Sequence, residues 1–169
     1  TLDGAIDTDT AAGVSITGNN LVLNDSVTTD NSGTVTLTQS GTVTIAASGD
    51  ISADGAVTLS GTGGITTAGD ITTTADSITF ATGTVLSGDV ALSTRATAGT
   101  ISFSSTLDGT TAGTEDLTLI AGSGNIAFNG NVGGNTRLGA IDIVSAANVD
   151  AGAITAASLV QQAGTGTTT

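Results

Sequence analysis

The fold of this chain can be predicted from residues 48–93, SGDISADGAVTLSGTGGITTAGDITTTADSITFATGTVLSGDVALS. It holds one short phrase three times, as Gly49-Asp50-Ile51, Gly69-Asp70-Ile71 and Gly88-Asp89-Val90. The phrase returns after 20 and then 19 residues, an interval far longer than the period of a helix or a strand. A long internal period of this kind is typical of a solenoid, in which each period forms one coil.

Short runs with apolar residues at alternate positions recur along the chain at similar intervals. Alternation with a period of two is the pattern of a β-strand, and the Gly, Asp, Asn and Ser between the runs supply turns. The runs begin at Val14, Val35, Val57, Ile78, Ile101 and Ile126. The steps between them are 21, 22, 21, 23 and 25 residues. Beyond Ile126 the pattern leaves the next member of the series open between Ile141 and Leu159.

Each period contains more than one strand-like piece, for example Val35–Thr38, Val43–Ala46 and Asp50–Ser52. No apolar stripe with a spacing of 3.6 residues can be drawn, which disfavours helix. The sequence therefore predicts an all-β fold, a right-handed parallel β-solenoid (β-helix) of about seven or eight coils of roughly 20–25 residues. Residues 1–169 form a single solenoid segment in this interpretation, either unbroken or with a loop excursion at Leu107–Asp116.

Equivalent residues of successive coils are expected to stack about 4.8 Å apart along the solenoid axis. The predicted inward columns are Val35, Val57, Ile78 and Ile101, and beside them Leu37, Leu59, Phe80 and Phe103. The third Phe of the chain, Phe128, is placed at the same interior position, where aromatic rings can stack.

The repeated Gly-Asp phrase is interpreted as the corner before a strand. Its Gly is expected to take a positive φ, its Asp to bond its own nearby backbone, and its apolar residue to turn inward. Stacked carboxylates of Asp50, Asp70 and Asp89 would repel one another, and bound Ca²⁺ would relieve this repulsion. Exposed turn residues and a calcium site are both open interpretations of this column. No residue is assigned as catalytic, cofactor-binding or metal-binding.

The charge of the chain limits its partners. Fourteen Asp and one Glu against Arg95 and Arg137 give a net charge of −13. Two arginines cannot form a basic patch, so nucleic acid is not an expected partner. No apolar stretch approaches the length of a membrane span. The acidity is expected to keep the molecule soluble and to discourage lateral aggregation.

Four further features of the sequence bear on function. Hydroxyl side chains alternate with the inward residues and predict an outward array that resembles the ice-binding surface of hyperactive antifreeze proteins. Its two columns are Ser15, Thr36, Thr58, Thr79 and Ser102, and Thr17, Thr38, Ser60, Ala81 and Ser104. Glu115-Asp116 is an adjacent acidic pair on a predicted loop, of the residue type that polysaccharide-active β-helix enzymes use. Residues 61–64, GTGG, are read as a turn, and Arg95 and Arg137 as loop charges that are either solvated or neutralise nearby acids.

The phrases DLTLIAGSGNIAFNGNVGG (116–134) and LGAIDIVSAANVDAGAITAASL (138–159) resemble the degenerate repeats of large bacterial surface proteins. These are the β-helix regions of filamentous-haemagglutinin-like proteins and autotransporter adhesins. The resemblance implies a secreted, cell-surface β-helical shaft that is part of a longer polypeptide, and it implies no catalytic residues. The start at Thr1, without Met, is interpreted in the same way.

The expected function is therefore that of a non-catalytic structural or adhesive shaft segment of an extracellular bacterial surface protein or filament. The expected partners are adjoining solenoid coils or copies of the chain end to end, and glycans or proteins on a host or neighbouring cell. No cofactor is expected. An ice-binding module is the first alternative, and a polysaccharide-active β-helix enzyme is the second.

Overall fold

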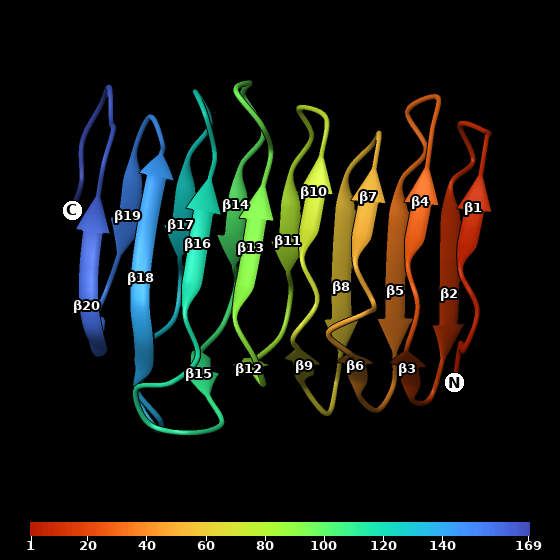
Figure 1. Cartoon of the computed structure of the whole chain (residues 1–169), viewed down its shortest axis with the longest axis horizontal. Helices are drawn as coiled ribbons and strands as arrows, with labels where there is room; N and C mark the ends of the chain where they lie inside the picture. Colours follow the sequence, from red (N-terminus) through yellow and green to blue (C-terminus); the bar gives the residue numbers. More distant parts are fainter.

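The computed structural model describes all 169 residues as a parallel β-solenoid, as the sequence predicts. The chain winds through three parallel sheets that run along the long axis, with the N-terminus at one end and the C-terminus at the other (Figure 1). The structure contains strands and no helix, so no helix long and apolar enough to cross a membrane is present.

The front sheet, nearest the viewer in Figure 1, has eight strands. In spatial order they are β1 (Ile6–Thr8), β4 (Val27–Thr29), β7 (Ile51–Ala53), β10 (Ile71–Thr73), β13 (Val90–Ser93), β16 (Leu117–Ile120), β18 (Leu138–Ser145) and β20 (Ala156–Gln161).

The other two sheets complete each coil. The seven-stranded back sheet consists of β2 (Val14–Gly18), β5 (Val35–Gln39), β8 (Val57–Gly61), β11 (Ile78–Phe80), β14 (Ile101–Phe103), β17 (Ile126–Phe128) and β19 (Val149–Ala151). The five-stranded short sheet consists of β3 (Leu21–Leu23), β6 (Val43–Ile45), β9 (Ile65–Thr67), β12 (Thr84–Leu86) and β15 (Leu107–Gly109).

Alternation within the strands builds one continuous core. Thirty-three buried apolar residues form a single cluster. In the back sheet, Val35, Val57, Ile78 and Ile101 pair in register, as do Leu37, Leu59, Phe80 and Phe103. The Phe103 ring lies 4.7 Å from the Phe80 ring and 5.5 Å from the Phe128 ring, stacked on both. The predicted columns and the aromatic stack are therefore confirmed.

The back-sheet register after Ile126 differs from both sequence alternatives. Ile126 pairs with Val149, whereas Ile141 and Leu159 pair with each other in the front sheet. The run at Val149 has a weak apolar alternation, because its outward residue is Asp150 and its second inward residue is Ala151.

The three Gly-Asp phrases do not all occupy one register. Ile51 pairs with Ile71, but Ile71 pairs with Leu92, so the third phrase lies two residues earlier in its strand. A shift of two residues keeps Val90 on the inward side, where it is 3% exposed. The expectation of equivalent corners is thus wrong at Gly88-Asp89.

The predicted positive φ of these glycines is also wrong. Gly49, Gly69 and Gly88 are not among the residues with positive φ. Gly is required at the first two because the backbone of the preceding coil lies so close. A Cβ on Gly49 would lie 2.7 Å from the Leu23 carbonyl oxygen, and one on Gly69 would lie 2.9 Å from that of Ala46.

Buried hydroxyls close the corner that follows the front sheet. Thr29, Thr73 and Thr94 are buried, and each donates a hydrogen bond from Oγ1 to a carbonyl oxygen three to five residues later. These bonds join each buried hydroxyl to the backbone of the turn that follows it. Threonine is therefore used inside this solenoid as well as on its surface.

The predicted excursion at Leu107–Asp116 is shorter in the structure. Leu107–Gly109 forms β15 of the short sheet, and the chain leaves the solenoid only at Thr110–Asp116 before it enters β16. This loop extends beyond the strands near β15 (Figure 1). Residues 61–64 form the end of β8 and a turn, with Gly64 at φ 101°.

Candidate functional site

The candidate calcium-binding residues Asp50, Asp70 and Asp89 accept hydrogen bonds from backbone N–H groups of the next coil. Asp50 Oδ1 accepts a hydrogen bond from the N–H of Asp70 at 2.8 Å, and Asp70 Oδ1 accepts one from Ala91 at 2.7 Å. Asp89 Oδ1 accepts one from the N–H of Asp116 at 2.9 Å. The expectation that each Asp bonds its own nearby backbone is therefore wrong for all three.

A positional rule explains these contacts. Each of these Asp residues immediately precedes a strand, and its oxygen binds the N–H at or near the start of the neighbouring strand. Asp70 and Asp116 stand just before β10 and β16, outside the strand ladder, so their N–H groups need another acceptor. We call these side chains the Asx caps. Besides the three named above, they are Asn20, Asp116, Asn125 and Asn148. Asn20, Asn125 and Asn148 were not predicted as site residues and Asp116 was predicted only as part of an acidic pair, although each stands directly before a run of apolar alternation.

The two-residue register shift opens a shallow hollow between the Asp caps. Its volume is about 320 Å³, and its lining includes Asp70, Asp89 and Asp116. One oxygen of each carboxylate already accepts a backbone N–H. The structure contains no group of three or more acidic, His or Cys side chains placed to hold a metal ion. Asp70, Asp89 and Asp116 thus line this hollow as residues that each cap the start of a strand in the next coil.

The outward hydroxyl array lies on the back sheet. Register pairs connect Ser15, Thr36, Thr58, Thr79 and Ser102 into one column, and Thr17, Thr38 and Ser60 into a second. Ala81 and Ser104 follow directly after the ends of β11 and β14. Ser102 donates a hydrogen bond to Thr79 at 3.3 Å. We call the outward residues of these two columns the hydroxyl face.

The acidic pair Glu115-Asp116 separates into two environments. Asp116 is exposed and is one of the Asx caps, whereas Glu115 is buried at 6% exposure. Glu115 Oε1 accepts hydrogen bonds from the Thr110 hydroxyl at 2.6 Å and from the N–H of Thr111 at 3.1 Å. Burial raises the pKa of Glu115, but these hydrogen bonds outweigh it and hold the pKa below its ordinary value. The Glu115 carboxylate thus closes the Thr110–Asp116 loop on itself.

A second buried carboxylate anchors the neighbouring loop. Asp108, 6% exposed, accepts hydrogen bonds from the N–H of Asn135 at 2.8 Å, from its side-chain amide at 3.0 Å and from the N–H of Thr136 at 3.2 Å. Arg137 follows directly and is exposed, with its guanidinium group over Gly113. The sequence analysis did not single out Asp108, because nothing in a short Leu-Asp-Gly run distinguishes a covered Asp from a turn residue.

Arg95 lies on the opposite side of the molecule, at an exposed turn with φ 61°. Asp54, across this corner, accepts hydrogen bonds from the Thr74 hydroxyl and from the N–H of Ser32. These bonds lower the pKa of Asp54, and the charge of Arg95 adds a smaller contribution in the same direction.

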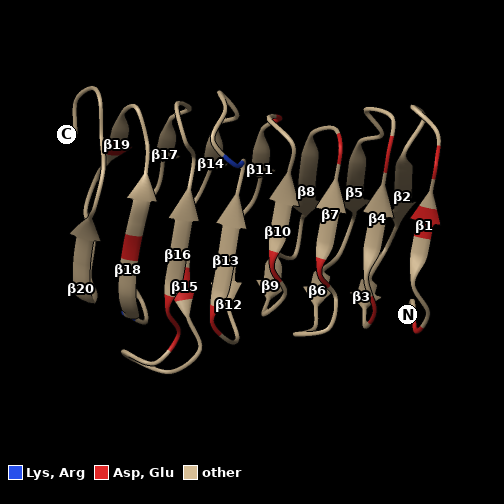
Figure 2. Cartoon of the chain, turned by 45° about the horizontal axis from the view of Figure 1, so that its top comes forward, with Lys and Arg blue, Asp and Glu red and all other residues tan.

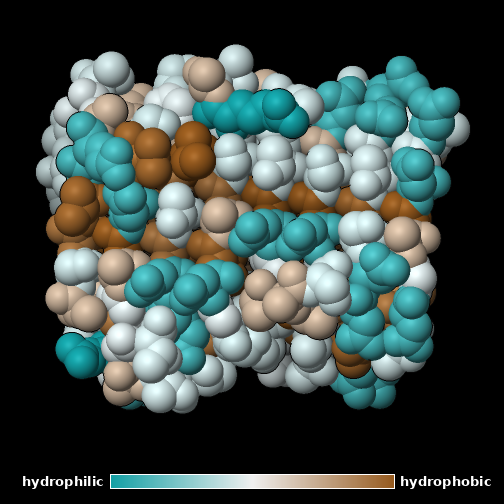
Figure 3. All heavy atoms as spheres, viewed as in Figure 1, coloured by the Kyte–Doolittle hydropathy of each residue, from teal (hydrophilic) through white to brown (hydrophobic).

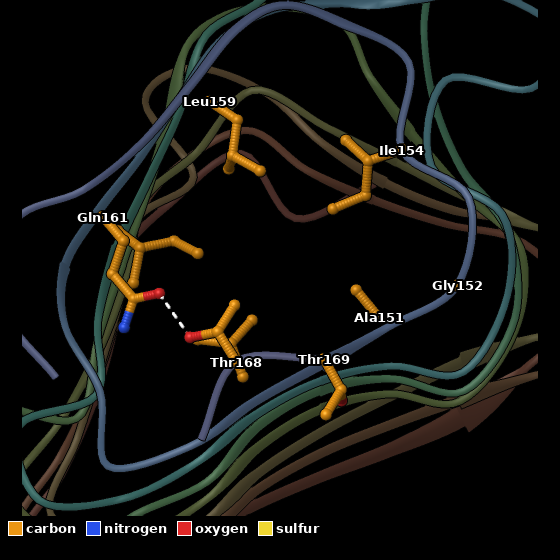
Figure 4. A pocket seen from close by; sticks show the side chains of 9 residues that line it. Ala151, Gly152, Ile154, Leu159, Gln161, Thr168 and Thr169 are labelled. Atoms are coloured by element: carbon orange, nitrogen blue, oxygen red, sulfur yellow. Dashed lines mark hydrogen bonds between the residues drawn. The ribbon is translucent and has the colours of Figure 1, made fainter. Parts of the chain in front are cut away.

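The C-terminal coil surrounds an open cavity of about 300 Å³. Ile154, Leu159 and Ala151 project into it from different sides of the coil (Figure 4). Gln161 takes the column position held by Ile143 in the previous coil, and the Thr168 hydroxyl donates a hydrogen bond to its Oε1 at 2.7 Å. The last coil thus carries a polar pair within an otherwise apolar interior, and Leu159 is 49% exposed.

Comparisons of the chain with protein-family models, with curated proteins and with solved structures find no match.

Proposed function

We propose that this chain is a rigid, non-catalytic shaft segment of an extracellular bacterial surface protein or filament. One observation carries the proposal: three parallel sheets run together along the molecule around one apolar core. The chain contains 98 backbone hydrogen bonds, and those of the strand ladders link each coil to its neighbours. Bending such a body requires the ladders of all three sheets to distort together, which favours a mechanical role.

Stacking on an adjoining coil follows from the same geometry. A coil placed on β20 would continue the front sheet and cover the apolar side chains Ile143, Ile154 and Leu159. Removing such surface from water is favourable, at about 25 cal/mol per Å² of apolar area. The adjoining coil belongs either to the same polypeptide or to a second copy.

Electron microscopy of the purified chain, with and without calcium, tests this proposal. Rods of uniform width support it, and their length separates the two sources of the adjoining coil. Long fibres one solenoid wide indicate end-to-end pairing of copies, and dispersed short rods indicate covalent continuation. A flexible or collapsed particle would contradict a shaft. A tandem duplication of residues 1–169 should double the rod length without a bend.

Ice binding is the second candidate, and the hydroxyl face is the observation that favours it. The column from Ser15 to Ser102 repeats at the strand spacing of about 4.8 Å along five strands of the back sheet. Thermal hysteresis of the wild-type chain, abolished by Thr36→Tyr with Thr58→Tyr, would establish this function. Its absence at high protein concentration would remove the candidate.

A further inference from the structure

Most charges of this chain lie on or beside the front sheet, whereas Asp150 lies in β19 of the back sheet. All 15 acidic residues and both arginines fall in short blocks, separated by long uncharged runs. The blocks are residues 3–9, 25–30, 50–54, 70–76, 89–95, 108–116 and 137–142, with Asp150 alone after them. Most blocks enclose or adjoin a strand of the front sheet. In Figure 2 the acids accordingly form two rows along the two ends of the front strands.

The front face shows this charge at its surface. Hydrophilic side chains form bands across it, and apolar atoms gather toward its C-terminal end (Figure 3). By contrast, the first six strands of the back sheet, β2 to β17, lie within uncharged runs. The expectation that acidity discourages lateral contact therefore applies to the front face and not to the back.

The hydroxyl face on these strands is suited to close contact with another flat surface. Its side chains are Ser, Thr and Ala, and Thr17 and Thr38 are exposed. The hydroxyls of Thr36, Thr38 and Thr58 make no hydrogen bond within the chain. Each hydroxyl can both donate and accept, so a ladder of hydroxyls is complementary to a second ladder of the same kind.

Electrostatics limits how two copies of this chain can approach. Two front faces would bring rows of carboxylates together, which is unfavourable at close range. The back of the molecule is separated from the front sheet by about 10 Å, the spacing of packed sheets, and this equals the Debye length at about 0.1 M salt. A partner on the hydroxyl face therefore lies farther from the front carboxylates than a partner on the front face does.

We propose that this chain pairs side by side with a second copy of itself through the hydroxyl face. Such pairing is isologous, with the same surface contributed by both copies, as in most homodimers. The inference is independent of the shaft proposal, because side-by-side pairing requires neither end-to-end stacking nor an extracellular location.

The area of the hydroxyl face determines how strongly two copies are expected to pair. Five strands at about 4.8 Å spacing and five residues at about 3.3 Å give about 400 Å² per copy. Twice this area lies below the roughly 1,200 Å² of a specific stable interface. A single segment should therefore pair weakly, whereas tandem segments should pair more tightly through avidity.

Cysteine cross-linking can capture a weak contact of this kind, since the chain contains no Cys. Thr38→Cys places a thiol on the hydroxyl face, and Ser52→Cys places a matched thiol on the front face. Both residues are exposed and lie within strands. At about 0.15 M salt, we expect a short bifunctional thiol reagent to cross-link Thr38→Cys about tenfold faster, which corresponds to about 1.4 kcal/mol.

A charge substitution provides the second measurement. Thr58→Asp, added to Thr38→Cys, should reduce the cross-linking rate to that of Ser52→Cys, whereas Thr72→Asp on the front sheet should leave the tenfold excess intact. Circular dichroism verifies that both variants keep the strand signal. Equal cross-linking of Thr38→Cys and Ser52→Cys would overturn the pairing of copies. So would an excess that Thr58→Asp does not reduce.

Discussion

The two halves of the front sheet have different residues at the corner before each strand. In the N-terminal half, Gly49 and Gly69 precede β7 and β10, and the backbone of the preceding coil lies against them. In the C-terminal half, the corresponding inward column holds Val90, Leu117 and Ile141, which are 3%, 1% and 1% exposed. The coils become longer as well: 20 residues separate Ile51 from its partner Ile71, and 27 separate Val90 from Leu117.

This difference shows which structural features stay constant along the solenoid. Strand pairing and the inward direction of alternate residues persist from β1 to β20, while the corner is narrow in one half and filled with apolar side chains in the other. The change takes place between β10 and β13, where the register shifts by two residues. A repeated sequence phrase therefore indicates that a corner is present, but the strand pairing determines the register of that corner.

The largest expected effect comes from the aromatic stack, which begins at Phe80 and continues through Phe103 and Phe128. Phe103→Ala should lower the free energy of unfolding by about 3–5 kcal/mol, because it leaves a cavity between two stacked rings. Leu37→Ala, in the same column of the N-terminal half, should cost less, about 2–3 kcal/mol. Urea denaturation followed by circular dichroism measures both. A smaller loss for Phe103→Ala than for Leu37→Ala would contradict the importance of the stack.

Exchanging the corner residues tests whether the narrow corner of the N-terminal half depends on glycine. Gly49→Val introduces the residue type of the C-terminal half, and its Cβ would lie 2.7 Å from the Leu23 carbonyl oxygen. We expect a loss of about 1–3 kcal/mol from this overpacking. Gly4→Ala is the control, since no atom lies within 4 Å of a Cβ there. If Gly49→Val were as stable as the wild type, the narrow corner would not depend on glycine.

The sequence was sufficient to predict the back sheet from β2 to β17, and it was insufficient for β19 and for the corners. In β5, β8, β11 and β14 the first two inward residues are large and apolar, so spacing and alternation define the register. At the corners the phrase Gly-Asp-apolar is compatible with two registers of the same parity, and only long-range pairing distinguishes them. The burial of Asp108 and Glu115 could not be predicted either, because it depends on loops that fold over them.

The Asx caps provide a smaller and more uniform test. Asp50→Ala removes the acceptor for the N–H of Asp70, and Asp89→Ala removes the acceptor for that of Asp116. Each should cost about 0.5–1.5 kcal/mol, with similar values in the two halves despite the register shift. Asp50→Asn should be nearly neutral, because the amide oxygen also accepts. Hydrogen exchange at the freed N–H groups measures the effect locally, and unchanged exchange would contradict the capping role.

The smallest expected effect is the pH dependence contributed by Glu115. Its pKa is lower in the folded chain than in the unfolded chain, so folding favours the ionised carboxylate. The stabilisation is therefore fully present above the unfolded pKa of about 4.3, and it is lost as the pH falls through the lower folded pKa. Glu115→Gln should remove this part of the acid limb in a plot of stability against pH. Asp30→Asn is the matched control, because Asp30 is exposed and its side chain makes no hydrogen bond within the chain. An acid limb that is equally steep in Glu115→Gln and in the control would mean that the Thr110 and Thr111 contacts do not select the charged form, and that the loop is closed by packing alone.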